Sequence, residues 1–180
     1  NAQFLLFLTS IIKAVDDYQD LLRVSVASAG NDHRLGANEA PPAIVSIFLG
    51  DELTEILKSI ENDTSYICKE KSPMEIGVRV LPKFFKDTTD RNRTSPFAFT
   101  GNKFEFRMLG SAFSIAGANI VLNTIVAEEL SQFADILENS SNFDEDLNTL
   151  IKNTIKSHNK IIFNGNNYSN DWVKEAEKRG

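Results

Sequence analysis

The fold of this chain is decided by the stretch FAFTGNKFEFR at residues 97–107. Two runs in which phenylalanine alternates with another residue flank a central Thr-Gly-Asn, a pattern typical of antiparallel strands joined by a tight turn. Because successive side chains of a strand point to opposite faces, the phenylalanines of the second run should enter the core, while Lys103, Glu105 and Arg107 share the other face. The stretch therefore predicts a β-hairpin that places one acid and two bases on a single surface.

Helical and strand patterns surround this hairpin. Apolar residues recur with helical spacing in several segments, and an Asn-Asp pair opens another helix near the end of the chain. Strands are expected where β-branched residues follow two prolines and where an alternating run ends at Pro82. The expected helices cover 2–26, 51–60, 115–137, 143–162 and 170–177, the expected strands cover 43–49 and 76–82, and residues 28–38 are expected to form a loop. This order predicts an α+β fold.

The composition is that of an ordinary globular protein with an acidic balance. The chain has 180 residues, 42% of them hydrophobic, which suffices for one domain with its own core. Its 19 Lys and Arg residues against 25 Asp and Glu residues give a formal net charge of −6, which does not favour binding to nucleic acid or to an anionic membrane. The apolar runs are far shorter than the ~20 residues that cross a bilayer. Cys68 is the only cysteine, which excludes an internal disulfide and indicates a reducing, cytoplasmic location.

Short motifs follow one another in a fixed order along the chain. They read NDHRL at 31–35, EAP at 39–41, NRTS at 92–95 and FEFR at 104–107. Each alone has an ordinary explanation, as a polar loop or as a solvated strand face with an ion pair. Taken together, they closely resemble the ordered motifs of glutamine synthetase, and their wording is similar to the type III branch of that family.

The resemblance implies a nucleotide and metal site. By analogy with the family, Glu105 is a ligand of a divalent cation, Mg²⁺ or Mn²⁺, as suits a hard ion that prefers carboxylate oxygen. Arg93 matches the arginine that stabilises the transferring phosphate, and Lys103 occupies the position of a basic residue beside the nucleotide. The implied cofactors are therefore ATP and the metal ion.

The same resemblance implies a glutamate site covered by a flap. Arg34 and Arg107 match the arginines that hold the substrate, each with a planar fork suited to a carboxylate. Glu39 matches the flap carboxylate that collects ammonium and shields the intermediate from water. Glu39, Arg34 and Arg93 are accordingly the expected catalytic residues.

The family's reaction is the ATP-dependent ligation of ammonia to L-glutamate, which gives L-glutamine through a γ-glutamyl phosphate intermediate. The resemblance implies the antiparallel β-sheet of the glutamine synthetase catalytic domain with packed helices, in a homo-oligomeric ring that is a dodecamer by resemblance alone. Two alternatives stay open. One is a related γ-glutamyl–amine ligase, and the other is a catalytically inactive homologue that acts as a structural or regulatory ring subunit.

The resemblance also suggests how the chain is divided. Residues 1–137 are expected to form part of the catalytic domain, with an insertion at 51–76, and residues 138–180 are expected to form a helical segment. The chain begins inside an apolar run and stops soon after a new helix starts, so we expect both ends to be cuts within a longer protein. The family's other metal ligands fall before this stretch, so we expect it to be inactive alone.

Several chemically suggestive residues have a structural interpretation instead. The four phenylalanines of the hairpin are expected to be core residues rather than ligand contacts. The pair Glu128-Glu129 and the acidic run at 144–146 are expected to lie on solvated helix surfaces, the run also suiting a helix N-terminus. His33 and His158 are poor metal ligands, and His158 is interpreted as a surface residue of an amphipathic helix.

Overall fold

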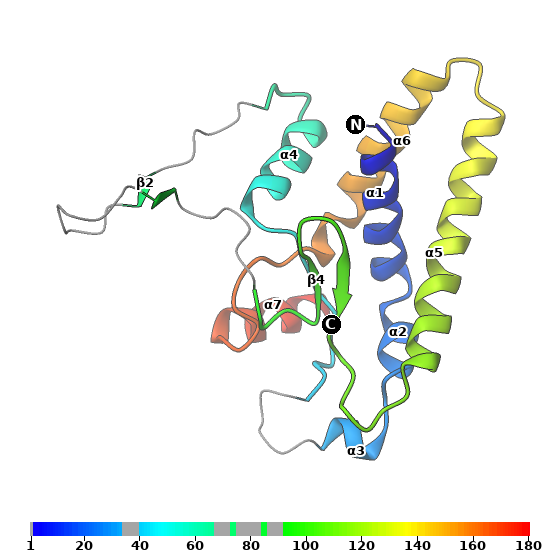
Figure 1. The fold of residues 1–180 in the computed structure, drawn as a ribbon. Coiled ribbons are helices and arrows are strands. Elements are labelled where there is room, and N and C mark those ends of the chain that lie inside the picture. The colour runs from blue at the N-terminus through cyan, green and yellow to red at the C-terminus, as the bar shows by residue number, and fades with distance from the viewer. Residues whose placement is uncertain (1, 34–39, 67–72, 75–83, 86–91) are drawn as a thin grey trace.

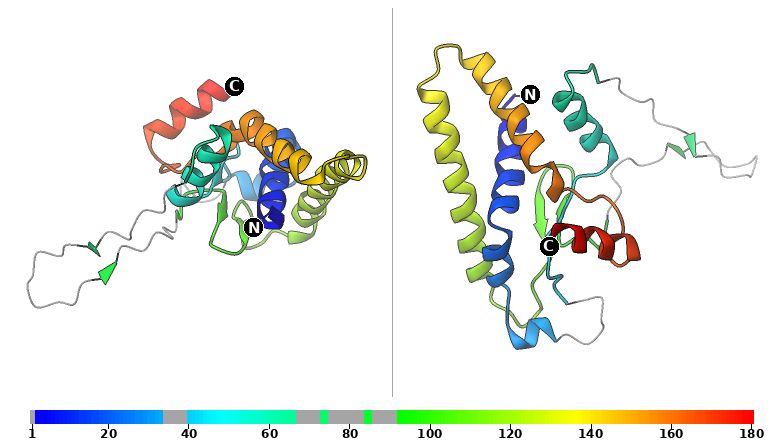
Figure 2. Two further views of the ribbon diagram at one scale, coloured as in Figure 1. Left: turned by 90° about the horizontal axis from the view of Figure 1, so that it is seen from above. Right: turned by 180° about the vertical axis from the view of Figure 1, so that it is seen from behind.

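The computed structural model describes residues 2–33, 40–66, 73–74, 84–85 and 92–180, and most of this part of the chain is helical (Figure 1). A helical bundle is formed by α1 (Ala2–Asp17), α2 (Gln19–Val24), α5 (Ile115–Glu138) and α6 (Phe143–His158). α2 continues the direction of α1, and α5 lies alongside both (Figure 2). The remaining helices are α3 (Ala29–Asp32), α4 (Asp51–Glu61), the 3-10 helix η1 (Asn159–Ile161) and α7 (Asn170–Arg179).

The sheet that contains the predicted hairpin has the strand order β1-β4-β5. Its strands are β1 (Ile47–Phe48), β4 (Phe97–Phe99) and β5 (Phe104–Phe106). β4 and β5 pair antiparallel, with Ala98 opposite Glu105, which confirms the hairpin. β1 pairs with β4 in parallel, so the expectation of a purely antiparallel sheet is wrong. A tight turn can join only antiparallel strands, and the long segment between β1 and β4 permits the parallel arrangement.

The helices agree closely with the patterns in the sequence. The helices expected over 51–60 and 115–137 correspond to α4 and α5. The helix expected over 143–162 is found as α6 followed by η1, and the helix expected from Asn170 is α7. The helix expected over 2–26 is interrupted at Tyr18, whose φ of −117° and ψ of 24° separate α1 from α2. The first part of the expected loop forms α3, because the Ser28 hydroxyl accepts a hydrogen bond from the Asn31 N–H and caps the turn.

The strand expected over 43–49 is much shorter in the structure. Extending the ladder between β1 and β4 by one residue would bring Ser46 opposite Pro96, and proline has no N–H to contribute to a ladder. On its other side, Ile47 forms a parallel bridge with Ile162. β1 is therefore a short central segment, held between β4 and the chain that follows η1.

The strand expected over 76–82 lies outside the described residues. Within the segment between α4 and β4, the structure describes an antiparallel pair, β2 (Pro73–Met74) and β3 (Phe84–Phe85), with Met74 opposite Phe84. None of the described helices combines the length and apolar character that a membrane span requires.

The apolar side of the hairpin packs onto the bundle. Phe97 is 1% exposed and stacks on Phe104, with ring centroids 5.1 Å apart. Phe99 and Phe106 are partly buried and pack against the same core. The expected core role is confirmed for Phe97, and the other three rings lie at the edge of the core.

A buried ion pair joins α1 to α5. Glu129 is fully buried and its carboxylate lies 2.6 Å from the Lys13 ammonium, which also lies 2.6 Å from Asp17. The expectation that Glu129 is solvated is wrong, because it shares the inward stripe of α5 with Ile125 and Phe133 at a spacing of four residues. Burial acts to lower the pKa of Lys13, but hydrogen bonds to Asp17 and Glu129 outweigh it and raise the pKa. The pair therefore contributes stability at neutral pH and loses it only as the pH rises through that raised pKa.

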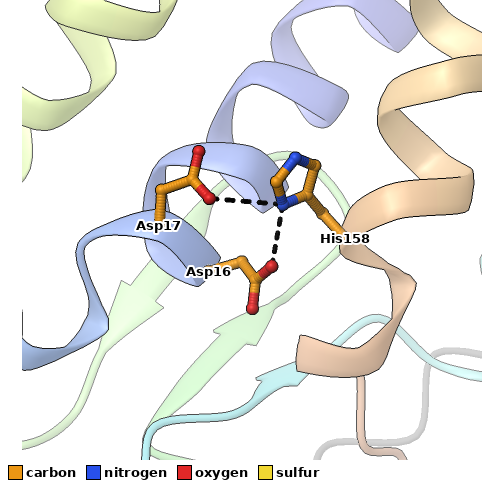
Figure 3. Close-up of side chains that lie close together, drawn as sticks. All are labelled: Asp16, Asp17 and His158. Carbon is orange, nitrogen blue, oxygen red and sulfur yellow. Dashed lines mark hydrogen bonds and ion pairs between the residues drawn. The ribbon is translucent and has the colours of Figure 1, made fainter.

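His158 lies at a second polar contact between the helices. Its Nδ1 lies 2.7 Å from Asp16 Oδ2 and 3.5 Å from Asp17 Oδ1, so α6 is tied to the end of α1 (Figure 3). The Asp16 side chain is 2% exposed, and its Oδ2 also lies 3.5 Å from Lys160 Nζ. The interpretation of His158 as a surface residue is wrong, because this side of α6 faces α1 rather than water.

Asn164 fixes the start of α4. Its Oδ1 accepts hydrogen bonds from the backbone N–H groups of Leu49 and Gly50, both at 3.1 Å, and its Nδ2 donates to Thr54 Oγ1 at 2.7 Å. Gly50 adopts a φ of +82°, which favours glycine, and both N–H groups belong to buried residues. Asn164 therefore anchors the two residues that lead into α4 and, through Thr54, the first turn of the helix.

We expect Asn164→Ala to lower the free energy of unfolding by about 1–3 kcal/mol, because two buried N–H donors lose their acceptor. Urea unfolding measures the change. Asn123→Ala is the matched control, since the Asn123 side chain donates to the carbonyl of Asn119 on the exposed face of α5. Equal effects of the two substitutions would contradict the role of Asn164 as the acceptor for the Leu49 and Gly50 N–H groups.

We expect Lys13→Met to cost about 3–5 kcal/mol of unfolding free energy, because Glu129 would stay buried without its counter-ion. The double variant Lys13→Met, Glu129→Leu should recover most of this loss, since it removes both charges. Lys156→Met, at an exposed position of α6, is the control in the same urea experiment. A double variant as unstable as the single one would show that the ion pair is not the cause.

Candidate active site

A cavity of about 910 Å³ lies beside the hairpin. One side is formed by the turn before β4 and by the β4–β5 hairpin, and the other by the end of β1 and the first turns of α4. Polar and charged residues gather on the hairpin side and apolar residues on the α4 side. The lining of the cavity includes Asn92, Arg93, Lys103, Glu105, Arg107, Glu52, Phe48, Leu53, Ile56 and Phe99.

The charged residues in and beside β5 meet on the cavity side of the hairpin. Arg107 donates to Glu105 Oε2 from Nη2 at 2.8 Å and from Nε at 3.1 Å. The other oxygen, Oε1, is held less closely, by the Thr100 hydroxyl at 3.3 Å and by Lys103 Nζ at 3.5 Å. The prediction that Lys103, Glu105 and Arg107 share one face is confirmed.

Glu105 is an anion at neutral pH. The hydrogen bonds from Arg107 lower the pKa of its carboxyl below the usual value and outweigh an opposing effect of burial, and the charges of Arg107 and Lys103 and the Thr100 hydroxyl act in the same direction. A carboxyl with a lowered pKa contributes stability above its ordinary pKa, and the contribution is lost as the pH falls through the lowered value. The cavity therefore offers an ionised oxygen ligand under physiological conditions.

Arg107 also holds the turn that carries Arg93. Its Nη1 donates to the backbone carbonyl of Asn92 at 2.5 Å, so one guanidinium bridges β5 and the residue before Arg93. Arg93 is exposed and lines the cavity, and the structure shows no ion pair between it and another described residue. Its positive charge is therefore available to an anionic ligand.

Two of the predicted site residues, Arg34 and Glu39, lie outside the described residues. The chain on both sides of them is anchored by Arg23 in α2, which donates to Asp32 Oδ1 at 2.7 Å and to the Pro42 carbonyl at 2.9 Å. Asn31 is buried, and its side chain donates to the carbonyl of Met108 at 2.9 Å. The NDHRL motif at 31–35 is therefore hydrogen-bonded directly to the residue that follows Arg107 at the end of the hairpin.

Much of the apolar wall of the cavity comes from α4, a segment for which the sequence predicted no part in the site. Leu53 and Ile56 of α4 face the cavity together with Phe48 and Phe99, and Glu52 lies at the rim. α4 belongs to the predicted insertion at 51–76. A helix was predicted over residues 51–60, but no local signal could show that its apolar side would meet the hairpin.

The charged side chains that line the cavity match part of what a divalent cation and phosphate groups require. Glu105 supplies an ionised carboxylate, and Glu52 is the other carboxylate among the described residues that line the cavity. A hard cation takes about six oxygen ligands, so these residues could provide only a fraction of its coordination. Arg93 and Lys103 are basic groups of the kind that bind phosphate.

We expect Arg107→Met to raise the pKa of Glu105 toward its ordinary value, because the first cause of the lowered pKa is removed. An NMR titration of the Glu105 side-chain carboxyl measures the shift. Lys160→Met removes one positive charge on η1 and is the control. A Glu105 pKa that stays low in Arg107→Met would contradict the assigned cause.

Comparisons with known proteins agree with the motif resemblance. A family model described as the glutamine synthetase C-terminal domain matches residues 146–180. The chain is 53% identical over 183 residues to the type-3 glutamine synthetase of Dictyostelium discoideum, an alignment that covers all of this chain and 25% of the relative. It is 45% and 48% identical over 188 residues to glutamine synthetases of Bacteroides fragilis (strain YCH46) and Butyrivibrio fibrisolvens, again over the whole chain and 26% of each relative. The chain is therefore similar over its whole length to part of each of these glutamine synthetases, and it spans about a quarter of the length of these curated relatives.

Proposed function

We propose that this chain supplies part of the active site of an ATP-dependent glutamate–ammonia ligase, which makes L-glutamine from L-glutamate and ammonia through γ-glutamyl phosphate. The observation that carries the proposal is the cavity in which an ionised Glu105, Lys103, Arg107 and an Arg93 that has no ion pair with another described residue lie together. The family relationship supports the reaction, and the cavity supports the part that these residues play in it.

The chemistry explains why these charges are needed. The reaction brings the glutamate carboxylate against the terminal phosphate of ATP, so two anions must approach each other. Arg93 and Lys103 offset that repulsion, and Arg93 stabilises charge on the transferring phosphoryl group. Glu105 would hold Mg²⁺ or Mn²⁺, which supplies further charge neutralisation at the phosphates. Its Oε1 is the oxygen with the longer contacts and is therefore the one more easily given to a cation.

The apolar wall suits the uncharged part of the nucleotide. Phe48, at the end of β1, and Leu53 and Ile56 of α4 line the side of the cavity opposite the hairpin. A purine ring is flat and largely apolar at its faces, and packing against aliphatic and aromatic side chains removes those faces from water. We therefore place the base of ATP against α4 and its phosphates toward Arg93.

Glutamate and ammonia are assigned by the family motifs. Arg107 and Arg34 would hold the glutamate carboxylates, and Glu39 would collect ammonium and exclude water from the acyl phosphate. Residues 1–137, with their insertion at 51–76, would belong to the catalytic domain, and residues 138–180 to a helical segment. We place the complete reaction in a cytoplasmic, homo-oligomeric ring, a dodecamer by analogy, and expect residues 1–180 alone to be inactive.

The proposal is tested with the full-length protein by measuring ATP-dependent product formation from glutamate with ammonia and with a panel of primary amines. Formation of glutamine from ammonia supports it. Activity with amines alone would identify a γ-glutamyl–amine ligase, and no turnover with either, in a correctly assembled protein, would indicate a structural or regulatory subunit.

We expect Glu105→Gln to lower kcat by about 10²–10³-fold at saturating Mg²⁺, as for other single groups that stabilise developing charge. The amide keeps the size of the side chain but removes the anionic oxygen. Glu138→Gln, at the exposed end of α5, is the control. Near-normal turnover of Glu105→Gln would exclude the role of Glu105 at the metal.

A further inference from the structure

Hydrogen bonds join the two neighbours of Arg93, Asn92 and Thr94, to each other and to a distant loop. The Thr94 hydroxyl donates to Asn92 Oδ1 at 2.6 Å, and the same oxygen accepts from the Thr94 N–H at 2.9 Å. The Thr94 hydroxyl also accepts from the backbone N–H of Asn167 at 2.9 Å, and Asn92 Nδ2 donates to the carbonyl of Gly165 at 2.7 Å. The residues before and after Arg93 are thus both bound to one loop, residues 164–167, more than seventy positions away in sequence.

The 164–167 loop also forms hydrogen bonds with the opposite wall of the cavity, which is made by β1 and α4. Asn167 Nδ2 donates to Ser46 Oγ at 2.8 Å, and both residues are buried, at 8% and 0% exposed. Asn164 holds the first turn of α4 through Gly50 and Thr54. The 164–167 loop therefore sets the position of the Arg93 turn relative to β1 and α4, and so the width of the cavity.

We infer that Asn92 and Thr94, held by the 164–167 loop, are positioning residues that direct Arg93 toward the phosphates of the nucleotide. The inference rests on the proposed function, which gives Arg93 its ligand. An exposed arginine has several rotatable bonds, and a fixed backbone on both sides of it reduces the freedom that must be lost when it meets a phosphate. Arg107 supplies the third fixed point, through the carbonyl of Asn92.

Thr94 offers a clean substitution. Its hydroxyl donates to Asn92 within the turn and accepts from the Asn167 N–H of the other loop, so valine, which has nearly the same shape, removes both bonds. Serine keeps both. The valine variant introduces no charge, and its direct effect is that the N–H of the buried Asn167 loses this acceptor.

In the full-length protein, we expect Thr94→Val to lower kcat/KM for ATP by about five- to tenfold, the effect of one or two lost hydrogen bonds. The KM for glutamate should change much less, because neither of the two lost hydrogen bonds involves a residue assigned to glutamate. Thr94→Ser should restore ATP kinetics, and Thr124→Val, at an exposed position of α5, should have no effect. Loss of glutamate and ATP affinity together, or no loss in Thr94→Val, would overturn the inference.

A double-mutant cycle with Arg93→Ala separates positioning from general destabilisation. If Thr94 acts through Arg93, then Thr94→Val should cause no further loss in the Arg93→Ala background. Losses that multiply would overturn the inference while leaving the proposed function intact. Unchanged ATP kinetics in Arg93→Ala itself would instead overturn the phosphate role of Arg93, and the inference would fail with it.

Hydrogen exchange provides a readout that does not depend on activity. The N–H of Asn167 bonds to the Thr94 hydroxyl, so its exchange should accelerate in Thr94→Val and return to the wild-type rate in Thr94→Ser. Unchanged exchange at Asn167 in the valine variant would show that the two loops are not coupled by this bond, and would overturn the inference.

Discussion

The guanidinium of Arg107 is the contact on which the cavity depends. It reaches Glu105 on its own strand and the carbonyl of Asn92 in the turn before β4, so a single planar group fixes both the acid and the turn that carries Arg93. A lysine could supply the charge but not donors in these two directions. The arrangement also keeps Glu105 ionised through its lowered pKa, which joins the geometry of the hairpin to the charge of the site.

Polar contacts over long sequence distances set the arrangement of the other elements around the hairpin. Glu129 on α5 is buried against Lys13, Asp16 on α1 is buried against His158, and Asn164 and Asn167 hold β1, α4 and the Arg93 turn. Buried polar groups are costly unless they find partners, so each pair strongly favours one relative placement of its two elements. The apolar core provides the stability, and these contacts specify the geometry.

The sequence predicted the hairpin because alternation along a strand is a local property. The shared face of Lys103, Glu105 and Arg107 followed from the same period, and so did most helices. The predictions failed where a distant partner decided the outcome. β1 begins only at Ile47 because Pro96, far along the chain, has no N–H to offer the ladder, and the buried Glu129 finds its counter-ion, Lys13, on another helix.

The sequence by itself determined the hairpin, the helices, the ordered motifs and, through them, the family. Only the tertiary structure decided that α4 forms a wall of the cavity and that the asparagine-rich loop at 164–167 fastens the Arg93 turn. The physical reason is the range of the interactions. Periodicity and capping act over a few residues and are visible in one segment, whereas a hydrogen bond between residues 94 and 167 depends on how the whole chain packs.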